Sequence, residues 1–288
     1  MKDVQYFAPD TLEEALQLLK EYAPRVHVLA GGTDLVRDMN LEFKIPDHVI
    51  WISKLPLEYI IEEGDLIRVG AATRMQTAGS SPVLKEKARA VAQAAKKLAS
   101  PTVRSLATLG GNLCTASPAA DCGCALLGLD AEVVLRRVGG ERVVPLRQFY
   151  LGPNRTVIQP DELLTEIRIR ATGKGEGSCY QKIGRRQAMT LAVLNATSRV
   201  KLDDQGVVEF AAIAVGAAAP TLLRIQAAEA MLVGKKMDEA SILEAGTIAS
   251  QVINPIDDVH GTIWYRRKVT GVLVARTLRE AAGINGGG

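Results

Sequence analysis

The sequence predicts an α+β fold in which a larger N-terminal region is followed by a smaller C-terminal domain of antiparallel sheet plus helices. Before residue 172, strand and helix patterns alternate around two glycine-rich segments. Residues 171–178 hold three glycines in eight positions, which is typical of a linker. A chain of 288 residues, 47% of them hydrophobic, can build two or three cores. We therefore expect domains at 1–172, with subdomains of about 1–56 and 57–172, and at 173–288.

The N-terminal region begins with a strand–helix–strand pattern. Asp10 or Thr11 caps a predicted helix that runs to about Tyr22 and repeats its apolar residues on one face. Short apolar runs after this helix predict strands, and the last two flank a turn, which predicts a hairpin. These strands are 26–29, 48–52, 59–61 and 66–69.

Further along the chain, Ser81 and Pro82 open a long predicted helix that continues to about Leu98. Pro101 is expected to end it. Glycines 139 and 140 form the turn of another predicted hairpin. The remaining predicted strands are 132–138, 142–144, 178–183, 192–202 and 207–215, and the remaining predicted helices are about 221–233, 238–252 and 262–282.

The composition argues against several classes of protein. The net charge of +3 is small and dispersed, and no long Lys/Arg run is present, so we expect no nucleic-acid partner. No apolar stretch reaches the length of a membrane span. Residues 1–6 lack the apolar core of a signal peptide, which predicts a cytoplasmic location.

The cysteines and histidines do not have the spacing of a zinc site, and we predict no metal in this chain. A disulfide framework is not expected in a cytoplasmic chain of this size. The chemistry must therefore come from a bound group. The residues concerned are Cys114, Cys122, Cys124, Cys179, His27, His48 and His260.

The first glycine-rich segment, residues 29–35 (LAGGTDL), leaves a predicted strand and enters a predicted helix. Consecutive glycines let backbone N–H groups turn inward, and a helix start favours an anion, so the segment can cradle a diphosphate. A plain tight turn is an equally good interpretation of this segment alone. The segment is neither a P-loop nor a Rossmann fingerprint, which argues against a nucleoside triphosphate and a Rossmann-type NAD site.

The second glycine-rich segment, residues 107–121 (ATLGGNLCTASPAAD), is rich in small and hydroxyl-bearing side chains. We expect a loop at 108–112 whose donors follow an extended phosphate or polyol ligand. Asp121 heads the next predicted helix, where it can cap the helix or accept hydrogen bonds from ligand hydroxyls. Two donor-rich glycine segments in one domain are harder to explain as turns than one.

Together the two segments resemble the FAD-binding subunit of the molybdenum hydroxylases, the family of xanthine dehydrogenases, nicotinate dehydrogenases and aerobic carbon monoxide dehydrogenases. The shared motifs keep the family's order along the chain, and the TLGGN motif followed by SPAAD is the most specific. The motifs are 30–34 (AGGTD), 107–112 (ATLGGN), 117–121 (SPAAD), 149–153 (FYLGP), 163–167 (LLTEI) and 265–267 (YRR).

The resemblance implies an FAD-binding fold of the vanillyl-alcohol-oxidase type in two subdomains, followed by the family's C-terminal domain. It also implies a division of labour among the residues that bind FAD. The diphosphate would be held by Gly31, Gly32, Thr33 and Asp34, with Leu29, Ala30 and Leu35 nearby; the second side would be lined by Thr108, Gly110, Gly111, Asn112 and Ser117; Asp121 would meet the ribityl region and Lys182 the isoalloxazine.

Some positions depart from the family or leave alternatives open. Lys182 and Arg186 match a basic segment beside the isoalloxazine in some members, but a solvated strand end is an equal alternative. Thr190 stands where many relatives have an acid. Cys122 and Cys124 could ligate a metal, although two sulfurs cannot enclose an iron–sulfur cluster, and buried thiols are the favoured interpretation.

The resemblance further implies partners: a large subunit with the molybdenum cofactor, where substrate is hydroxylated, and a small subunit with two [2Fe–2S] clusters. Electrons would pass from these clusters through the flavin to NAD or another acceptor, so we nominate no catalytic acid, base or nucleophile. The alternatives are a self-sufficient FAD-dependent oxidase or dehydrogenase and a subunit that has lost its flavin. The former is usually longer and richer in aromatic residues than this chain, which has 4%.

Overall fold

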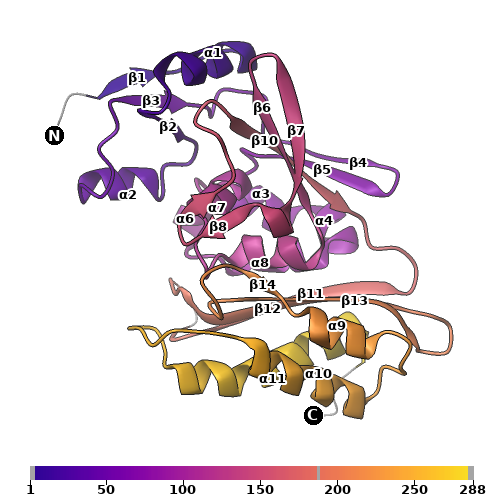
Figure 1. Ribbon diagram of the computed structural model, residues 1–288. Helices are drawn as coiled ribbons and strands as arrows, with labels where there is room; N and C mark the ends of the chain where they lie inside the picture. The colour runs from indigo at the N-terminus through magenta and orange to yellow at the C-terminus, as the bar shows by residue number, and fades with distance from the viewer. Residues whose placement is uncertain (1–3, 187–188, 285–288) are drawn as a thin grey trace.

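Sheets and helices alternate along the long axis of the molecule in the computed structural model, which describes residues 4–186 and 189–284 (Figure 1). A small parallel sheet lies at the N-terminal end, beside a five-stranded antiparallel sheet. A layer of short helices separates the latter from a four-stranded antiparallel sheet, whose far face carries the C-terminal helices. The predicted α+β fold, with a C-terminal domain of antiparallel sheet plus helices, is confirmed.

The parallel sheet contains β1 (Gln5–Phe7), β3 (His48–Trp51) and β2 (Val26–Leu29), paired in that order. The predicted strands at 26–29 and 48–52 are thus confirmed. Helix α1 (Leu12–Tyr22) is capped by Thr11, whose hydroxyl accepts from a first-turn N–H. Its buried apolar stripe packs onto the sheet to form a core of its own, which includes Ala15, Leu16, Leu19, Ile50 and Ile52.

The five-stranded sheet has the order β4 (Ile60–Glu63), β5 (Leu66–Gly70), β10 (Leu163–Arg170), β6 (Glu132–Arg137) and β7 (Gly140–Pro145). All neighbours are antiparallel, and both predicted hairpins are present. The central strand, β10, was not expected from the sequence. It is buried along nearly its whole length, so it lacks the alternation of buried and exposed residues that marks a half-buried strand.

Short helices form the layer between the two larger sheets. One prediction for this layer is wrong: the helix expected from Pro82 to Leu98 is two helices, which break at Ala88 (φ −148°, ψ 50°). Pro101 begins a helix rather than ending one. The helices are α3 (Met75–Ser80), α4 (Pro82–Lys87), α5 (Arg89–Lys97), α6 (Pro101–Arg104), α7 (Leu109–Thr115) and α8 (Asp121–Gly128); a 3₁₀ turn (Leu146–Gln148) and strands β8 (Tyr150–Gly152) and β9 (Arg155–Thr156) follow.

The C-terminal domain is a meander of long strands with helices on one face. β11 (Glu176–Gly184), β12 (Ala192–Leu202) and β13 (Val208–Gly216) confirm the predicted strands, and a short β14 (Leu223–Arg224) adds to the edge. Helix α8 packs against the other face of β12 and β13. The helices are α9 (Gln226–Leu232), α10 (Glu239–Val252) and α11 (Ile263–Ala281), close to the predicted ranges. Within the described ranges, none of the helices is both long and apolar enough to cross a membrane.

The two parts of the chain are tied together by a carboxylate near the end of α11. Glu280 accepts from Arg89 Nη2 at 2.8 Å and from Gln93 Nε2 at 3.0 Å, both on α5. Its second oxygen accepts from Gln181 Nε2 on β11 at 2.9 Å. Strand β11 begins inside the segment predicted to be a linker; the domain boundary at 172 stays a prediction.

Candidate functional site

The segment between β2 and α2 (Leu35–Asn40) presents unpaired backbone donors. The N–H groups of Gly31, Gly32, Thr33 and Asp34 have no hydrogen-bond partner among the described residues. Gly32 has φ +74°, in the left-handed region that favours glycine. A run of free N–H groups that leads into a helix is a suitable site for an anionic oxygen.

The first segment lies directly against the start of the second. A Cβ on Gly31 would lie 1.9 Å from the carbonyl oxygen of Leu106, so only glycine fits there. Across the same contact, Thr115 Oγ1 donates to Asp34 Oδ2 at 2.9 Å. The structure thus brings together two segments that are some 80 residues apart in the sequence.

Residues 108–112 of the second glycine-rich segment form the cap and first turn of α7, so the prediction of a loop there is wrong. Thr108 caps α7, and its hydroxyl accepts from the Gly111 N–H at 3.0 Å. The Gly110 N–H donates to Ala71 O at 2.8 Å. Thr108 and Gly110 are buried, and the backbone donors expected for a ligand are used inside the protein. The glycines here allow close packing, because a Cβ on Gly110 would lie 2.7 Å from Ala71 O.

The side chains of this segment link α7 to α8. Asn112 Oδ1 accepts from the Gly123 N–H at 3.3 Å. Ser117 Oγ accepts from the Ala119 N–H at 3.2 Å, which fixes the turn that precedes α8. Asn112 and Ser117 remain partly accessible to solvent. The predicted residues of the second segment therefore lie close together, and most of their hydrogen bonds are made within the protein.

Asp121 begins α8 but does not cap it. Its carboxylate accepts from Lys182 Nζ at 3.0 Å and from the Tyr180 hydroxyl, both on β11 of the C-terminal domain. The side chains of Lys182 and Asp121 are only 6% and 10% exposed. Burial raises the pKa of the Asp121 carboxyl above its ordinary value, although Lys182 and Tyr180 pull this pKa down. The pair is a buried ionic contact between the two parts of the chain.

Lys182 is not a solvated strand end. Besides Asp121, its ammonium donates to Lys97 O at 3.0 Å and to Thr190 O at 3.4 Å. Arg186 is instead exposed, and its Nε donates to Met189 O at 2.8 Å. The alternative of a solvated charge is therefore wrong for Lys182, while its contact with a flavin stays a prediction.

Several polar residues near these helices were not assigned roles from the sequence. Tyr180 lies two residues before Lys182 on the same face of β11 and reaches the same carboxylate, a spacing that a strand pattern could have revealed. Asn195 Oδ1 and the Tyr150 hydroxyl are buried without a hydrogen-bond partner in the described part of the chain. A Cβ on Gly123 would lie 2.9 Å from that hydroxyl, which explains the glycine between the two cysteines.

Cys122 and Cys124 are buried thiols, as the favoured interpretation states. Cys122 Sγ lies 3.5 Å from Met75 Sδ, and Cys124 Sγ lies 3.6 Å from Thr197 Oγ1. Burial raises the pKa of the Cys124 thiol to about 12, so it stays protonated. Residues 4–186 and 189–284 contain no group of three or more His, Cys, Asp or Glu side chains arranged for a metal ion.

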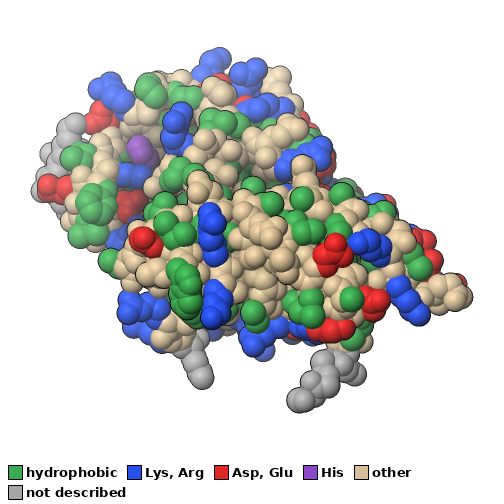
Figure 2. All heavy atoms as spheres, turned by 60° about the horizontal axis from the view of Figure 1, so that its bottom comes forward, with side chains coloured by type: hydrophobic (Ala, Val, Ile, Leu, Met, Phe, Trp, Pro, Cys, Tyr) green, Lys and Arg blue, Asp and Glu red, His purple; other side chains and the backbone are tan. Residues whose placement is uncertain are grey.

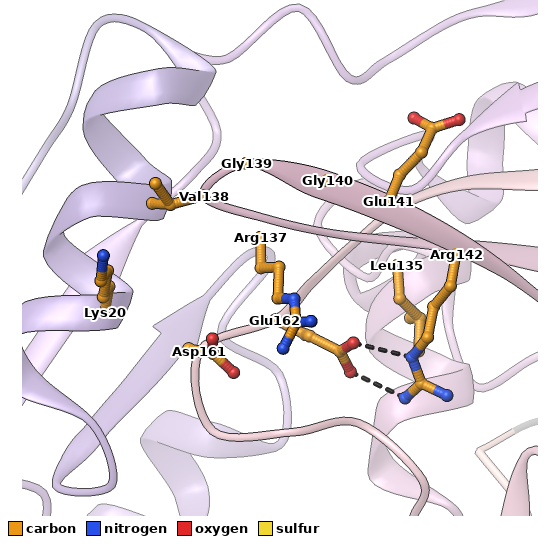
Figure 3. A pocket seen from close by; sticks show the side chains of 10 residues that line it. All are labelled: Lys20, Leu135, Arg137, Val138, Gly139, Gly140, Glu141, Arg142, Asp161 and Glu162. Atoms are coloured by element: carbon orange, nitrogen blue, oxygen red, sulfur yellow. Dashed lines mark hydrogen bonds and ion pairs between the residues drawn. The ribbon is translucent and has the colours of Figure 1, made fainter.

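A defined cavity of about 250 Å³ lies away from these segments, beside the β6–β7 hairpin (Figure 3). Arg142 and Glu162 form a two-point ion pair in its wall, with Nε to Oε1 at 2.7 Å and Nη2 to Oε2 at 2.8 Å. Arg137 points toward this pair, and Glu141 points away. The cavity contains none of the predicted site residues, and the free N–H groups at 31–34 are the stronger indication of a binding site.

Comparisons with known proteins point in the same direction. The family model described as the FAD binding domain in molybdopterin dehydrogenase matches residues 2–170, and that of the CO dehydrogenase flavoprotein C-terminal domain matches residues 178–281. The nicotinate dehydrogenase FAD-subunit of Eubacterium barkeri is 36% identical over 279 residues, which cover 94% of each chain. The carbon monoxide dehydrogenase medium chain of Hydrogenophaga pseudoflava is 33% identical over 279 residues, which cover 96% of each.

A solved structure is also close to this chain. Carbon monoxide dehydrogenase from Hydrogenophaga pseudoflava, in a form that lacks the Mo-pyranopterin moiety of the molybdenum cofactor, superposes with a TM-score of 0.93. The match covers 98% of each chain at 33% sequence identity. The whole chain, from the parallel sheet to α11, therefore shares one architecture with this relative.

Proposed function

We propose that this chain, which belongs to the family of FAD-binding subunits of the molybdenum hydroxylases, takes electrons from [2Fe–2S] clusters of a small partner subunit and passes them to NAD or another acceptor. A large partner subunit would hold the molybdenum cofactor and oxidise the substrate. The observation that carries the proposal is the run of free N–H groups at Gly31, Gly32, Thr33 and Asp34 inside a matched FAD-binding domain. The cysteines are unpaired, which supports the cytoplasmic location that we also propose.

The donor chemistry of the first segment fits the diphosphate of FAD. Gly31 and Gly32 have no side chains of their own that could cover the N–H groups, and α2 begins directly beyond them. Leu106 O lies where a Gly31 side chain would point, so the segment packs closely against the residues that precede α7. We assign Gly31, Gly32, Thr33 and Asp34 to the diphosphate, with Leu29, Ala30 and Leu35 supporting them.

The remaining residues would orient the cofactor from the other side. Asn112 and Ser117 are accessible enough to offer side-chain contacts, whereas Thr108 and Gly110 hold α7 in place from buried positions. Asp121 and Lys182 form a contact between the domains where the ribityl chain and the isoalloxazine are expected. When bound, FAD supplies the ability to accept electrons singly and to give them up in pairs.

The test separates an electron-transfer subunit from a self-sufficient oxidase. Under anaerobic conditions, substrate is mixed first with the isolated chain and then with the complex that contains the iron–sulfur and molybdenum subunits, and flavin absorbance is followed. Aldehydes, purines and N-heterocycles are tested as substrates. We expect bleaching in the complex only. Bleaching of the isolated chain at a rate that supports turnover would establish the oxidase instead.

A further inference from the structure

Large apolar side chains gather on the connection between α10 and α11 and on the first turn of α11. Ile256 is 66% exposed, Val259 78% and Trp264 67%. Single exposed apolar residues are common, but three large ones within nine positions, including a tryptophan, indicate an interaction surface.

This segment is held rigidly rather than being a loose loop. Arg266, whose side chain is 3% exposed, donates to Ile256 O at 2.6 Å and to both oxygens of Asp258 at 2.8 and 2.9 Å. Arg185, on the β11–β12 hairpin, donates to Val259 O at 2.7 Å. A surface fixed in this way loses little conformational entropy on binding, as a docking site requires.

The charges around the apolar side chains are positive. Arg185, Arg267 and Lys268 are exposed and form no ion pair within the described ranges. Lys268 Nζ lies 4.9 Å from the centre of the Trp264 ring. Two acidic residues lie nearby: Asp258 is paired with Arg266, and Asp257 accepts from the Ile263 N–H, so the three cations outnumber the one carboxylate that has no cationic partner among the described residues. Figure 2, which turns this end of the molecule forward, shows Lys and Arg side chains among hydrophobic ones. We call Arg185, Ile256, Val259, Trp264, Arg267 and Lys268 the α11 surface.

The connection between β11 and β12 links the α11 surface to the candidate FAD site. Arg185 lies three residues from Lys182 on β11, and Lys182 Nζ donates both to Thr190 O, near the start of β12, and to Asp121. A protein docked on this surface would therefore lie beside the contact between the two domains, where the isoalloxazine is expected.

We propose that the α11 surface docks the iron–sulfur partner subunit, through a face of that subunit that is apolar and acidic. The proposal rests on the proposed function, because an electron donor must approach the flavin and this surface adjoins its site. Apolar contact at Trp264 and Val259 would provide the buried centre, and the cations would pair with carboxylates at the rim. A second copy of this chain is a poor occupant, because a symmetric contact would set the same cations against each other.

The test uses the complete complex, co-expressed and purified through a tag on this chain. Trp264→Glu and the double variant Arg185→Glu/Lys268→Glu are compared with Leu243→Glu, which places the same charge on an exposed apolar position (52%) of α10. Iron, molybdenum and FAD are measured in each preparation. We expect iron per FAD to fall about tenfold or more in the first two variants and to stay unchanged in the control, because a buried unpaired carboxylate or a reversed charge is costly at an interface. FAD per chain and the melting temperature should be unchanged.

Each other outcome is decisive. Full iron in both α11-surface variants, or loss of molybdenum with iron retained, would overturn the docking proposal and leave the proposed function standing. Wild-type chain that carries FAD but never co-purifies with iron would instead defeat the proposed function. Binding of wild-type chain, but not Trp264→Glu, to phosphatidylserine vesicles with iron unaffected would assign the surface to a membrane and overturn the proposal.

Discussion

Thr115 Oγ1 lies 2.9 Å from Asp34 Oδ2 and 3.0 Å from Gly111 O, two acceptors for its single proton, so one hydroxyl joins the two glycine-rich segments. The bond leaves Asp34 oriented beside the free N–H groups that we assign to the FAD diphosphate. The position of the first segment is therefore set in part by a helix that lies far away in the sequence.

Thr115→Val should weaken FAD binding while keeping the fold. Losing one partly buried hydrogen bond to a carboxylate costs about 1–2 kcal/mol, which is roughly a five- to thirtyfold increase in Kd. Thr247→Val is the matched control, because Thr247 Oγ1 makes the same helix-backbone bond, to Leu243 O at 2.9 Å, without a carboxylate partner. Kd is measured by flavin fluorescence titration of the apoprotein. Equal Kd values in the two variants would show that the bond to Asp34 does not support the site.

Gly32→Ala should abolish or strongly reduce FAD occupancy. Gly32 has φ +74°, and a Cβ there would meet Leu29 and Val36 side-chain atoms at 3.3 Å, so these neighbours must give by a few tenths of an ångström beside the free N–H groups. Gly206→Ala carries nearly the same backbone strain, at φ +76°, with nothing within 4 Å. Both variants should lose about 1 kcal/mol of stability, but only the first should lose flavin. The measurement is the absorbance of the flavin band per chain. Full FAD occupancy in a folded Gly32→Ala protein would show that the segment is only a turn and does not bind FAD.

Lys182→Met should destabilise the protein by about 3–5 kcal/mol at neutral pH, because it leaves the buried Asp121 carboxylate without its cation. Burial already raises the pKa of Asp121, and loss of Lys182 raises it further. A carboxyl with a raised folded-state pKa contributes stability at low pH that is lost as pH rises. The destabilisation should therefore shrink as pH falls toward about 4. Denaturant unfolding at several pH values tests this, with Asp121→Asn/Lys182→Met expected to recover part of the loss. If the losses of stability in the two single variants simply add up in the double variant, Asp121 and Lys182 are not a coupled pair.

Glu166→Gln should remove part of the acid sensitivity of folding. Burial opposes ionisation of Glu166, but hydrogen bonds from Arg68, Arg168 and Tyr59, each 2.8 Å long, hold its pKa below the ordinary value. Such a carboxylate stabilises the fold above its unfolded-state pKa, and this stability is lost as pH falls through the folded-state pKa. The variant should melt lower than wild type at pH 7, with a gap that closes in acid. Glu63→Gln removes only an exposed bridge to Arg68 and should change little at either pH.

Local patterns predicted most of the fold, and the exceptions have tertiary causes. No glycine or proline marks the break at Ala88, so a single helix was the natural expectation. The freed carbonyl of Lys87 accepts from both the N–H and the hydroxyl of Thr172, and the Ala90 N–H donates to Ser178 Oγ. These partners lie more than 80 residues away in the sequence. A prediction from local sequence pattern therefore does not include them.

For the candidate site, too, some residues could be predicted from local sequence pattern and others could not. The turn at Gly31 and Gly32 could be predicted, because glycines between a strand and a helix have few other uses. The role of Gly110 could not, because the close contact with Ala71 that excludes a side chain depends on how α7 packs against the connection that follows β5. The link from Asp121 to Lys182 crosses the domain contact, so only the family resemblance suggested that these residues belong together.

The bonds made by Glu280 also bear on how the protein comes apart. Arg89 and Gln93 of the N-terminal part hold this carboxylate of α11. Helix α11 therefore joins the two parts of the chain independently of the backbone that precedes β11. A protease that nicks the backbone between Thr172 and Gly175 would yield two fragments that remain associated and migrate together on a sizing column. Heating should then release them in a single transition, since neither half can open without breaking the contacts of the other.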